Sequence, residues 1–540
     1  MASKRNVPSM NRRGFLAGTS ACVGGLLAGS AARAFGQTET PYGNNLNSCP
    51  VVGPEGQIMV PHKLEPTHLP TQRVPWDAVE VRMAVQDDPH CLHPGPKELA
   101  LKGPWCDIVE IMSLDERTKF QEMLGFGGTI TDSDVYNLIR LSPEKRHAAI
   151  VALAGKDGLG FNLMRIPFGS TDANREPNRD MNFYTYCDVP KGETDPKLAH
   201  FSVQKDIDRG IIDVIKEFRA VNPQLQLLAS VWGVPAWMTT NKLIYHGFFD
   251  STYTEVYADY LVKSIQAYAK LGIPIEYLTV QNEPSCGGDR ATPAAMWTWQ
   301  QERDVLLAVA KRFAANHITT KLWIMDHNFD MAQTFAKPLL DDPRIKKITH
   351  MVAYHDYRGR PEEMALLSRQ HPEIPAVISE HSYGTIRQLG RLMDILANGA
   401  TGQISWTTVS NGRARPVPPQ PGAPAGAAPP PAASTPPDYD RMTRTMVVPM
   451  EDNPNFHLPV TYCGYQTFSP LIQRGARRIA SNVLTRLDTS NVAFRNPDGS
   501  VVAVLVNFGN EAFDMGILRG NASFLFNMPA NTILSVRFKT

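Results

Sequence analysis

Eight short apolar runs alternate with longer segments of helical pattern between residues 122 and 406, and this alternation constrains the fold most strongly. Runs of this length followed by helical segments are typical of a parallel sheet covered by helices. Eight such units in succession predict an α/β fold, a (β/α)8 TIM barrel, whose active site lies at the carboxyl ends of the strands. The predicted strands are 122–130, 161–168, 224–232, 275–282, 321–326, 350–355, 376–380 and 402–406.

Two of the intervening segments have a clear apolar face at helical spacing. The face of the first includes Ile207 and Phe218, and that of the second runs from Tyr257 to Tyr268. Thr252 and Glu255 have the spacing of a capping box and predict the start of the second helix.

A chain of 540 residues accommodates the barrel and one smaller domain. The barrel is predicted over 119–465, and the Pro- and Ala-rich stretch 413–437 within it is interpreted as a surface loop, with a lid as the alternative. Runs at 500–507, 513–518 and 532–538, separated by turn sequences, predict a small antiparallel β-domain over 466–540.

Residues 1–34 have the features of a twin-arginine signal peptide. Arg12 and Arg13 precede a Gly-, Ala- and Leu-rich stretch, and cleavage is expected after Ala34. A chance arginine pair is the alternative. The mature chain is therefore expected to be exported to the periplasm or beyond the cell, with an extended leader over 35–77. No later segment is long and apolar enough to predict an integral membrane protein.

Charge and cysteine content narrow the partners and cofactors. The net charge of +1 provides no field that would attract nucleic acid. Six cysteines follow the signal, and their spacing leaves the disulfide pairing open, with Cys91 and Cys106 as the preferred pair. The chain has no C-x-x-C motif, so neither a structural zinc site nor a redox motif is predicted. No metal and no organic cofactor are predicted for the chain as a whole.

Two glutamates lie where predicted strands end. Glu283 stands in Asn-Glu-Pro after the fourth strand, where proline stops the strand, and Glu380 ends the seventh. Strands four and seven face each other across a barrel mouth. Two facing carboxylates are what glycoside hydrolysis requires, although a single Asn-Glu-Pro could equally be an ordinary solvated or helix-capping glutamate.

Other strand ends carry residues suited to a sugar, because aromatic rings stack on its C–H faces and polar groups bind its hydroxyls. Each aromatic residue or histidine taken alone could also be an ordinary core residue. The candidates for substrate binding are Asp172, Trp232, His355, Tyr357 and Trp406.

Five motifs together resemble glycoside hydrolase family 30, the glucosylceramidase-like retaining β-glycosidases of clan A. They occur in the family order at 124–128 (LGFGG), 162–167 (NLMRIP), 228–232 (LASVW), 281–285 (QNEPS) and 379–380 (SE), and the resemblance covers residues 78–540. Five motifs in order are far more specific than one glycine-rich match.

This resemblance implies a retaining mechanism with Glu283 as acid/base and Glu380 as nucleophile. It implies that Asn282 binds the sugar 2-hydroxyl and that Arg165 supports the nucleophile together with His355 and Tyr357. A cation and a phenol are expected to keep Glu380 ionised, and a less polar setting to raise the pKa of Glu283. The family barrel also carries a β-sandwich built from both chain ends, so 78–118 is expected to join 466–540.

The predicted function is hydrolysis of β-glucosides in the manner of a glucosylceramidase. Ser405 stands where those enzymes have an acidic residue, so a β-xylosidase, a β-fucosidase or an endo-β-1,6-glucanase are alternatives on the same scaffold. The alternatives outside enzymes are a glycan-binding protein without turnover and a structural envelope protein. Retention of both glutamates argues against the former, and the position of the Pro-rich stretch inside the fold argues against the latter.

Overall fold

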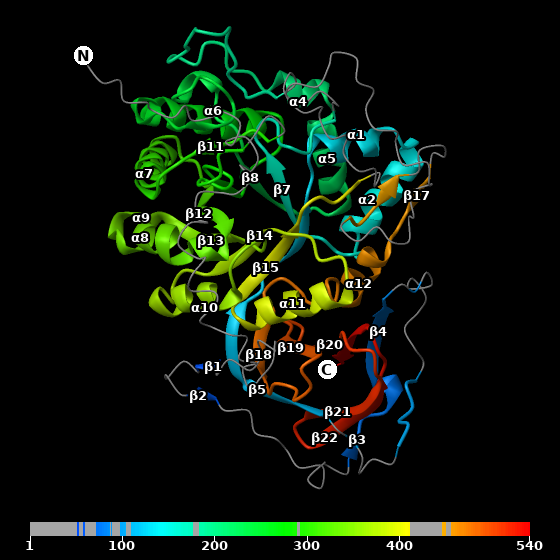
Figure 1. Ribbon diagram of the computed structural model, residues 1–540. Helices are drawn as coiled ribbons and strands as arrows, with labels where there is room; N and C mark the ends of the chain where they lie inside the picture. Colours follow the sequence, from blue (N-terminus) through cyan, green and yellow to red (C-terminus); the bar gives the residue numbers. More distant parts are fainter. Residues whose placement is uncertain are drawn as a thin grey trace, which may run out of the picture. The chain divides into compact units, whose positions relative to one another are not determined.

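The computed structural model (Figure 1) describes residues 51–52, 58–59, 72–86, 88, 98–103, 108, 110–175, 183–288, 292–410, 445–449 and 455–539. The predicted signal peptide, most of the predicted leader, the Pro-rich stretch 413–437 and the pair Cys91 and Cys106 lie outside the described residues.

Eight parallel strands form a closed barrel, with the last strand paired to the first, so the predicted fold class is confirmed. Each strand lies within or overlaps one of the eight predicted runs. The strands are β6 (Gly125–Thr129), β7 (Leu163–Pro167), β8 (Gln226–Ser230), β10 (Tyr277–Thr279), β12 (Lys321–Asn328), β13 (Thr349–His355), β14 (Ala376–Glu380) and β15 (Ala400–Ser405).

Helices lie between successive barrel strands, as the alternation predicts (Figure 1). They are α1 (Asp132–Ile139), α2 (Pro143–Ala154), α4 (Gln204–Asp208), α5 (Ile211–Val221), α6 (Thr254–Lys270), α7 (Trp299–Ala315), α8 (Lys337–Asp341), α9 (Pro343–Ile348), α10 (Pro361–Gln370) and α11 (Ile386–Ala397), with α12 (Val460–Phe468) after the barrel. Among the described residues, no helix is both long and apolar enough to cross a bilayer.

Two local helix predictions are wrong. Ile207 belongs to α4 and not to α5, because Gly210 adopts a left-handed φ of 78° that separates the two helices. The predicted capping box of Thr252 and Glu255 does not form either. The Asp250 side chain accepts the Thr252 N–H instead and caps a short 3-10 turn before α6.

A nine-stranded, mostly antiparallel sheet forms the second domain, in the order β3-β22-β21-β5-β18-β19-β20-β23-β4. Three of its strands, β3, β4 and β5, come from before the barrel and the other six from after it, so both chain ends contribute, as the family resemblance implies. The strand β5 runs to Glu122, so it crosses the expected domain boundary at 118/119. The strands are β3 (Gln72–Arg73), β4 (Val79–Val85), β5 (Glu110–Glu122), β18 (Arg477–Ser481), β19 (Thr489–Arg495), β20 (Val501–Asn507), β21 (Phe513–Arg519), β22 (Ala522–Met528) and β23 (Thr532–Phe538).

A compact apolar cluster from the barrel strands includes Leu163, Leu228, Trp323, Met351 and Val377. Layers of inward side chains make the interior of such a barrel a packed core and not a pore. Polar side chains are therefore available for chemistry only beyond this core, at the two ends of the barrel.

Candidate active site

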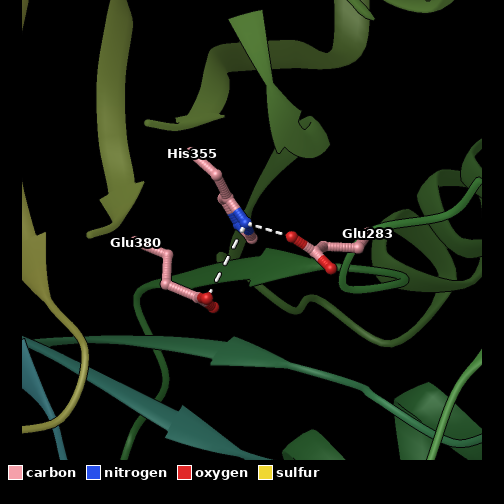
Figure 2. A group of neighbouring side chains, drawn as sticks. All are labelled: Glu283, His355 and Glu380. Carbon is pink, nitrogen blue, oxygen red and sulfur yellow. Dashed lines mark hydrogen bonds and ion pairs between the residues drawn. The ribbon is translucent and has the colours of Figure 1, made fainter. Parts of the chain in front are cut away.

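Glu283 and Glu380 meet at the carboxyl ends of their strands (Figure 2). One carboxylate oxygen of each and one ring nitrogen of His355 all lie within 4.8 Å of one another. The Glu380 side chain is 7% exposed and the Glu283 side chain 22% exposed. A separation of about 5 Å is typical of retaining glycosidases, whereas inverting enzymes hold their carboxyl groups roughly 6.5–9.5 Å apart.

Arg165, in β7, is fully buried and joins the residues around the nucleophile candidate. Its guanidinium donates hydrogen bonds to Glu380, to Ser230 Oγ (3.0 Å), to Asn282 Oδ1 (2.6 Å) and to Asp326 Oδ2 (2.7 Å). A planar guanidinium with several fixed donors orients carboxylates in a way that lysine cannot. Arg165 thus contacts the nucleophile candidate directly, at the position that the family resemblance implies for it, and links it to three further polar residues by hydrogen bonds.

Asp326, at the end of β12, lies at the centre of this network, and the sequence reasoning did not identify it as a site residue. Burial raises its pKa, but the charges of Arg165 and His355 and several hydrogen bonds hold the pKa far below its usual range. The signal available in the sequence was the polar run Asp-His-Asn at 326–328, which ends the fifth predicted strand. The donors to its carboxylate are Arg165, Ser230, Thr279, His355 and Ser379.

The backbone at the site is strained in three places. Met325 and Asp326 have φ values of 72° and 49°, and Glu283 has a φ of 45°, although none of them is glycine. The strand register shifts between Met325 and His327, and this shift turns the Asp326 side chain toward the network. The buried Glu302 of α7 holds the irregular backbone, because its Oε1 accepts the Met325 N–H at 2.8 Å.

His355 lies between the two glutamates and is itself fully buried. Its Nδ1 is 3.0 Å from Glu283 Oε1 and 3.9 Å from Glu380 Oε1, and its Nε2 is 3.1 Å from Asp326 Oδ1. Burial lowers the pKa of His355, but the surrounding carboxylates outweigh it and raise the pKa to about 10. His355 is therefore a cation at neutral pH.

This cation reverses the expected order of the two glutamate pKa values. Burial raises the pKa of Glu283, but the hydrogen bond and charge of His355 lower it more. Burial and the neighbouring Glu283 raise the pKa of Glu380 despite its contacts with His355 and Arg165. The expectation of a less polar setting around Glu283 was wrong, because a histidine that the sequence places near Glu380 also bonds to Glu283.

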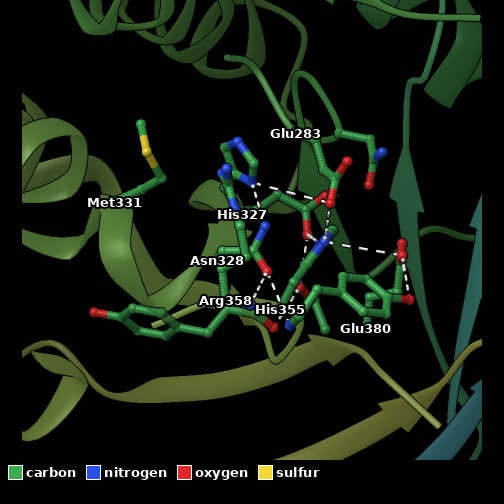
Figure 3. A network of polar contacts seen from close by, with 12 residues as sticks. Glu283, His327, Asn328, Met331, His355, Arg358 and Glu380 are labelled. Carbon is green, nitrogen blue, oxygen red and sulfur yellow. Dashed lines mark hydrogen bonds and ion pairs between the residues drawn. The ribbon is translucent and has the colours of Figure 1, made fainter. Parts of the chain in front are cut away.

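Glu283 has a second histidine beside it, which the sequence reasoning also missed (Figure 3). His327 Nδ1 lies 4.0 Å from Glu283 Oε1, and its Nε2 is 2.6 Å from Ser285 Oγ. Burial lowers the pKa of His327 to about 4, so the ring is neutral at pH 7. Glu283 is thus flanked by one charged and one neutral imidazole.

The predicted sugar-binding residues gather around the two glutamates, although the Trp232 side chain is itself buried, with 3% exposed. The rings of Trp232 and Trp406 stack with centroids 5.2 Å apart, and the Tyr357 hydroxyl donates to Glu380 Oε1 at 2.8 Å. Burial, Glu380 and Glu283 raise the pKa of that hydroxyl, and Asp172 contributes in the same direction. Asn282 uses its Oδ1 to accept from Arg165, which directs its amide donor elsewhere.

Comparisons with known proteins fit this geometry. Residues 123–389 match the glycosyl hydrolase family 30 TIM-barrel domain, and residues 475–536 match the glycosyl hydrolase family 30 beta sandwich domain. The chain belongs to glycoside hydrolase family 30. It is a glycoside hydrolase by this membership, as the sequence motifs predicted.

Characterised relatives of this family 30 member differ in substrate. The chain is 25% identical over 446 residues to lysosomal acid glucosylceramidase of Mus musculus, covering 77% of this chain and 80% of that protein. It is 26% identical over 442 residues to an endo-1,6-beta-D-glucanase of Trichoderma harzianum, covering 76% and 83%. A solved endo-beta1,6-glucanase is similar with a TM-score of 0.70 and 25% identity over 86% of this chain and 99% of that one.

The arrangement supplies a buried, oriented carboxylate beside a more exposed one. Both oxygens of Glu380 accept hydrogen bonds, one from Arg165 and one from Tyr357. Among the described contacts, only one oxygen of the Glu283 carboxylate takes part in a hydrogen bond, with His355. The former geometry suits a fixed nucleophile, and the latter suits a group that reaches a substrate oxygen.

Proposed function

We propose that this family 30 enzyme hydrolyses β-glucosides by double displacement, in the manner of a glucosylceramidase. The observation that carries the proposal is the separation of the two facing carboxylates, whose nearest oxygens lie within 4.8 Å. This spacing leaves no room for a water molecule between the sugar and the second carboxylate, which an inverting mechanism requires.

In the first step, a Glu380 oxygen attacks the anomeric carbon while the bond to the aglycone oxygen breaks. This step starts from the form in which the one proton shared by the two glutamates is on Glu283 and Glu380 is ionised. Glu283 gives that proton to the leaving oxygen, and a glycosyl ester with Glu380 results. In the second step, Glu283 removes a proton from water, whose oxygen attacks the anomeric carbon and releases Glu380. The Arg165 and Tyr357 donors fix Glu380 in line for both displacements.

The remaining polar groups select the sugar. Asn282 presents its amide donor toward the 2-hydroxyl, where a hydrogen bond strengthens as the oxocarbenium character develops. Trp406 supplies apolar surface for the glucose ring and stacks on Trp232, which is 3% exposed and also contacts the Arg165 guanidinium. Asp172 is proposed to bind a hydroxyl of the sugar. The β-glucosyl group is proposed as glycone because the glucosylceramidase and endo-1,6-glucanase relatives both act, by name, on glucosyl compounds.

An endo-β-1,6-glucanase is the second candidate. The solved endo-beta1,6-glucanase aligns over 86% of this chain at 25% identity, a likeness equal to that of the glucosylceramidase. The two candidates share the catalytic pair and the glycone and differ in the aglycone. Hydrolysis of a fluorescent glucosylceramide and of a β-1,6-glucan by the same preparation separates them.

The catalytic roles are tested with azide on two variants and an aryl β-glucoside. Glu380→Gly is expected to give α-glucosyl azide, because azide enters the vacant nucleophile site. Glu283→Ala is expected to give β-glucosyl azide, because azide replaces water in the second step. The wild-type enzyme is expected to release β-glucose first, which proton NMR detects before mutarotation.

The matched control is Glu255→Gln, at an exposed glutamate of α6 whose side chain is 73% accessible. It is expected to retain wild-type turnover. Aryl β-xyloside and β-fucoside assays run beside the glucoside assay. A preference for either sugar would contradict the proposed glycone, and first release of the α-anomer would contradict double displacement.

A further inference from the structure

A second cavity lies at the opposite end of the barrel from the glutamates. It has a volume of about 1080 Å³ and is bounded by residues at the amino ends of barrel strands, such as Tyr277 and His350, and by strands of the second domain. The packed barrel core, which includes Tyr277 and Met351, separates it from the catalytic pocket. The reaction proposed above makes no use of this space.

Arg478 of β18 lines this cavity and is a buried cation without a carboxylate partner. The residue is 7% exposed, and its side chain forms no ion pair with any part of the chain that the structure describes. Burial lowers the pKa of its guanidinium to about 9, so it still carries its charge at pH 7. A buried and unpaired charge is unfavourable, which makes this position unusual for an arginine that only fills space.

The Arg478 guanidinium is also held in a fixed orientation. Its Cζ lies 3.6 Å from the centre of the Phe120 ring, and its Nε donates to Gln121 Oε1 at 3.0 Å. Gln121 is fixed in turn, because its amide donates to the carbonyl oxygens of Leu396 and Ala400 at 2.6 and 3.1 Å. The two Nη groups have no hydrogen-bond partner among the described residues. Their N–H donors are therefore held in a fixed orientation and are available to a ligand.

Positive charge predominates in the lining of the cavity. Glu122 is paired with Arg477 at 2.9 Å, and Glu373 is paired with Lys346 outside the lining. Glu122 therefore cancels the charge of Arg477, and Lys346 cancels that of Glu373, so the charges of the other four lining cations are in excess. The charged lining residues are Lys119, Arg369, Arg474, Arg477 and Arg478 on the positive side and Glu122 and Glu373 on the negative side.

We propose that this cavity binds a small oxyanion, a phosphate or carboxylate group, through the Nη fork of Arg478. Two parallel N–H groups match two oxygens of such a group, and the surrounding cations favour its charge. Binding of an anion there would neutralise the buried guanidinium and link the base of the barrel to β18. The proposal does not depend on the sugar hydrolysed at the other end.

The test measures binding of inorganic phosphate to the whole enzyme by calorimetry and by the shift in unfolding temperature, with sodium chloride at equal ionic strength as the salt control. We expect phosphate, and not chloride, to raise the unfolding temperature by a few degrees at saturation. Acetate in a parallel titration distinguishes a carboxylate from a phosphate preference. Arg478→Met is expected to abolish the shift.

Arg495→Gln is the matched control, because Arg495 of the neighbouring strand β19 is 43% exposed, is already paired with Glu116 and does not line the cavity. It is expected to keep the binding. If Arg478→Met fails to fold, Arg478→Lys serves instead, and we expect about tenfold weaker binding from loss of the fork. No binding of either anion to the wild-type enzyme, or unchanged binding in both Arg478 variants, would overturn the proposal.

Discussion

Glu302→Gln is the substitution whose effect on stability follows most directly from the structure. Glu302 is 1% exposed, and its Oε1 accepts the Met325 N–H, while its Oε2 has no hydrogen-bond partner among the described residues. Burial raises the pKa of this carboxyl to about 8, and the nearby Asp326 adds to the effect. Glutamine keeps the acceptor for Met325 and carries no charge at any pH.

The magnitude follows from the difference between the folded and unfolded pKa values. The unfolded chain ionises Glu302 near the ordinary value of 4.5, whereas the folded protein does so near 8. The protonated form is favoured by folding, so wild-type stability falls as pH rises from about 4.5 toward 8. At pH 7 this loss is about 3 kcal/mol, at roughly 1.4 kcal/mol for each pKa unit.

The assay is urea unfolding of both proteins at several pH values between 5 and 8, with Glu255→Gln as the control at an exposed position. The difference in unfolding free energy is expected to grow with pH in favour of Glu302→Gln, with kcat/KM near the wild-type value. Glu302→Leu removes the acceptor for Met325 and should reduce kcat/KM by disturbing Asp326. Parallel stability curves for wild type and Glu302→Gln would refute a buried, neutral Glu302.

Three further predictions concern other buried groups. Arg165→Lys should lower kcat/KM by about 10²-fold or more with the fold retained in circular dichroism, because one ammonium cannot replace four oriented donors. His355→Asn removes the cation that most lowers the pKa of Glu283, so the pH at which kcat/KM falls on the alkaline side should rise, and an unchanged alkaline side would contradict a charged His355. Asp206→Ala leaves three buried tyrosine hydroxyls without their acceptor and should cost about 3 kcal/mol or more in urea unfolding, with a smaller loss from Tyr268→Phe.

The barrel was predictable because each of its strands is a short apolar run and because topology fixes which ends meet. Glu283 and Glu380 could be placed together from strand order alone, although 97 positions separate them. The strands of the second domain after residue 500 followed from the same kind of pattern, whereas β18 and β19 carry buried polar residues that obscure it.

The centre of the site could not be predicted in the same way. Asp326 reaches Arg165 only because Met325 and Asp326 adopt positive φ values and the strand register shifts. Aspartate tolerates positive φ better than most residues, but methionine does not, so the segment gives no clear sequence signal for this backbone. His355 was likewise only partly predictable. Its place at a strand end followed from the sequence, but its contact with Glu283, which is closer than its contact with Glu380, did not. Side-chain rotation, and not strand order, decides these contacts.

The charges of the site explain why the two glutamates must be treated as a pair. Arg165 and His355 carry two positive charges, whereas ionised Asp326, Glu283 and Glu380 carry three negative charges. One proton shared by the two glutamates makes the cluster neutral, and double displacement needs this one-proton state. His355 influences which glutamate holds the proton, because it lies 3.0 Å from Glu283 and 3.9 Å from Glu380.

A substrate with a good leaving group needs no proton from an acid, so the pH dependence of its hydrolysis reports on the nucleophile of this pair. With 2,4-dinitrophenyl β-glucoside, the acid side of the kcat/KM profile reports ionisation of Glu380 alone. Glu283 is one of the groups that raise the pKa of Glu380, so Glu283→Gln should move this limb to lower pH. Glu255→Gln should leave it in place. If the acid side of the kcat/KM profile is unchanged or moves to higher pH in Glu283→Gln, the two carboxylates do not share one proton.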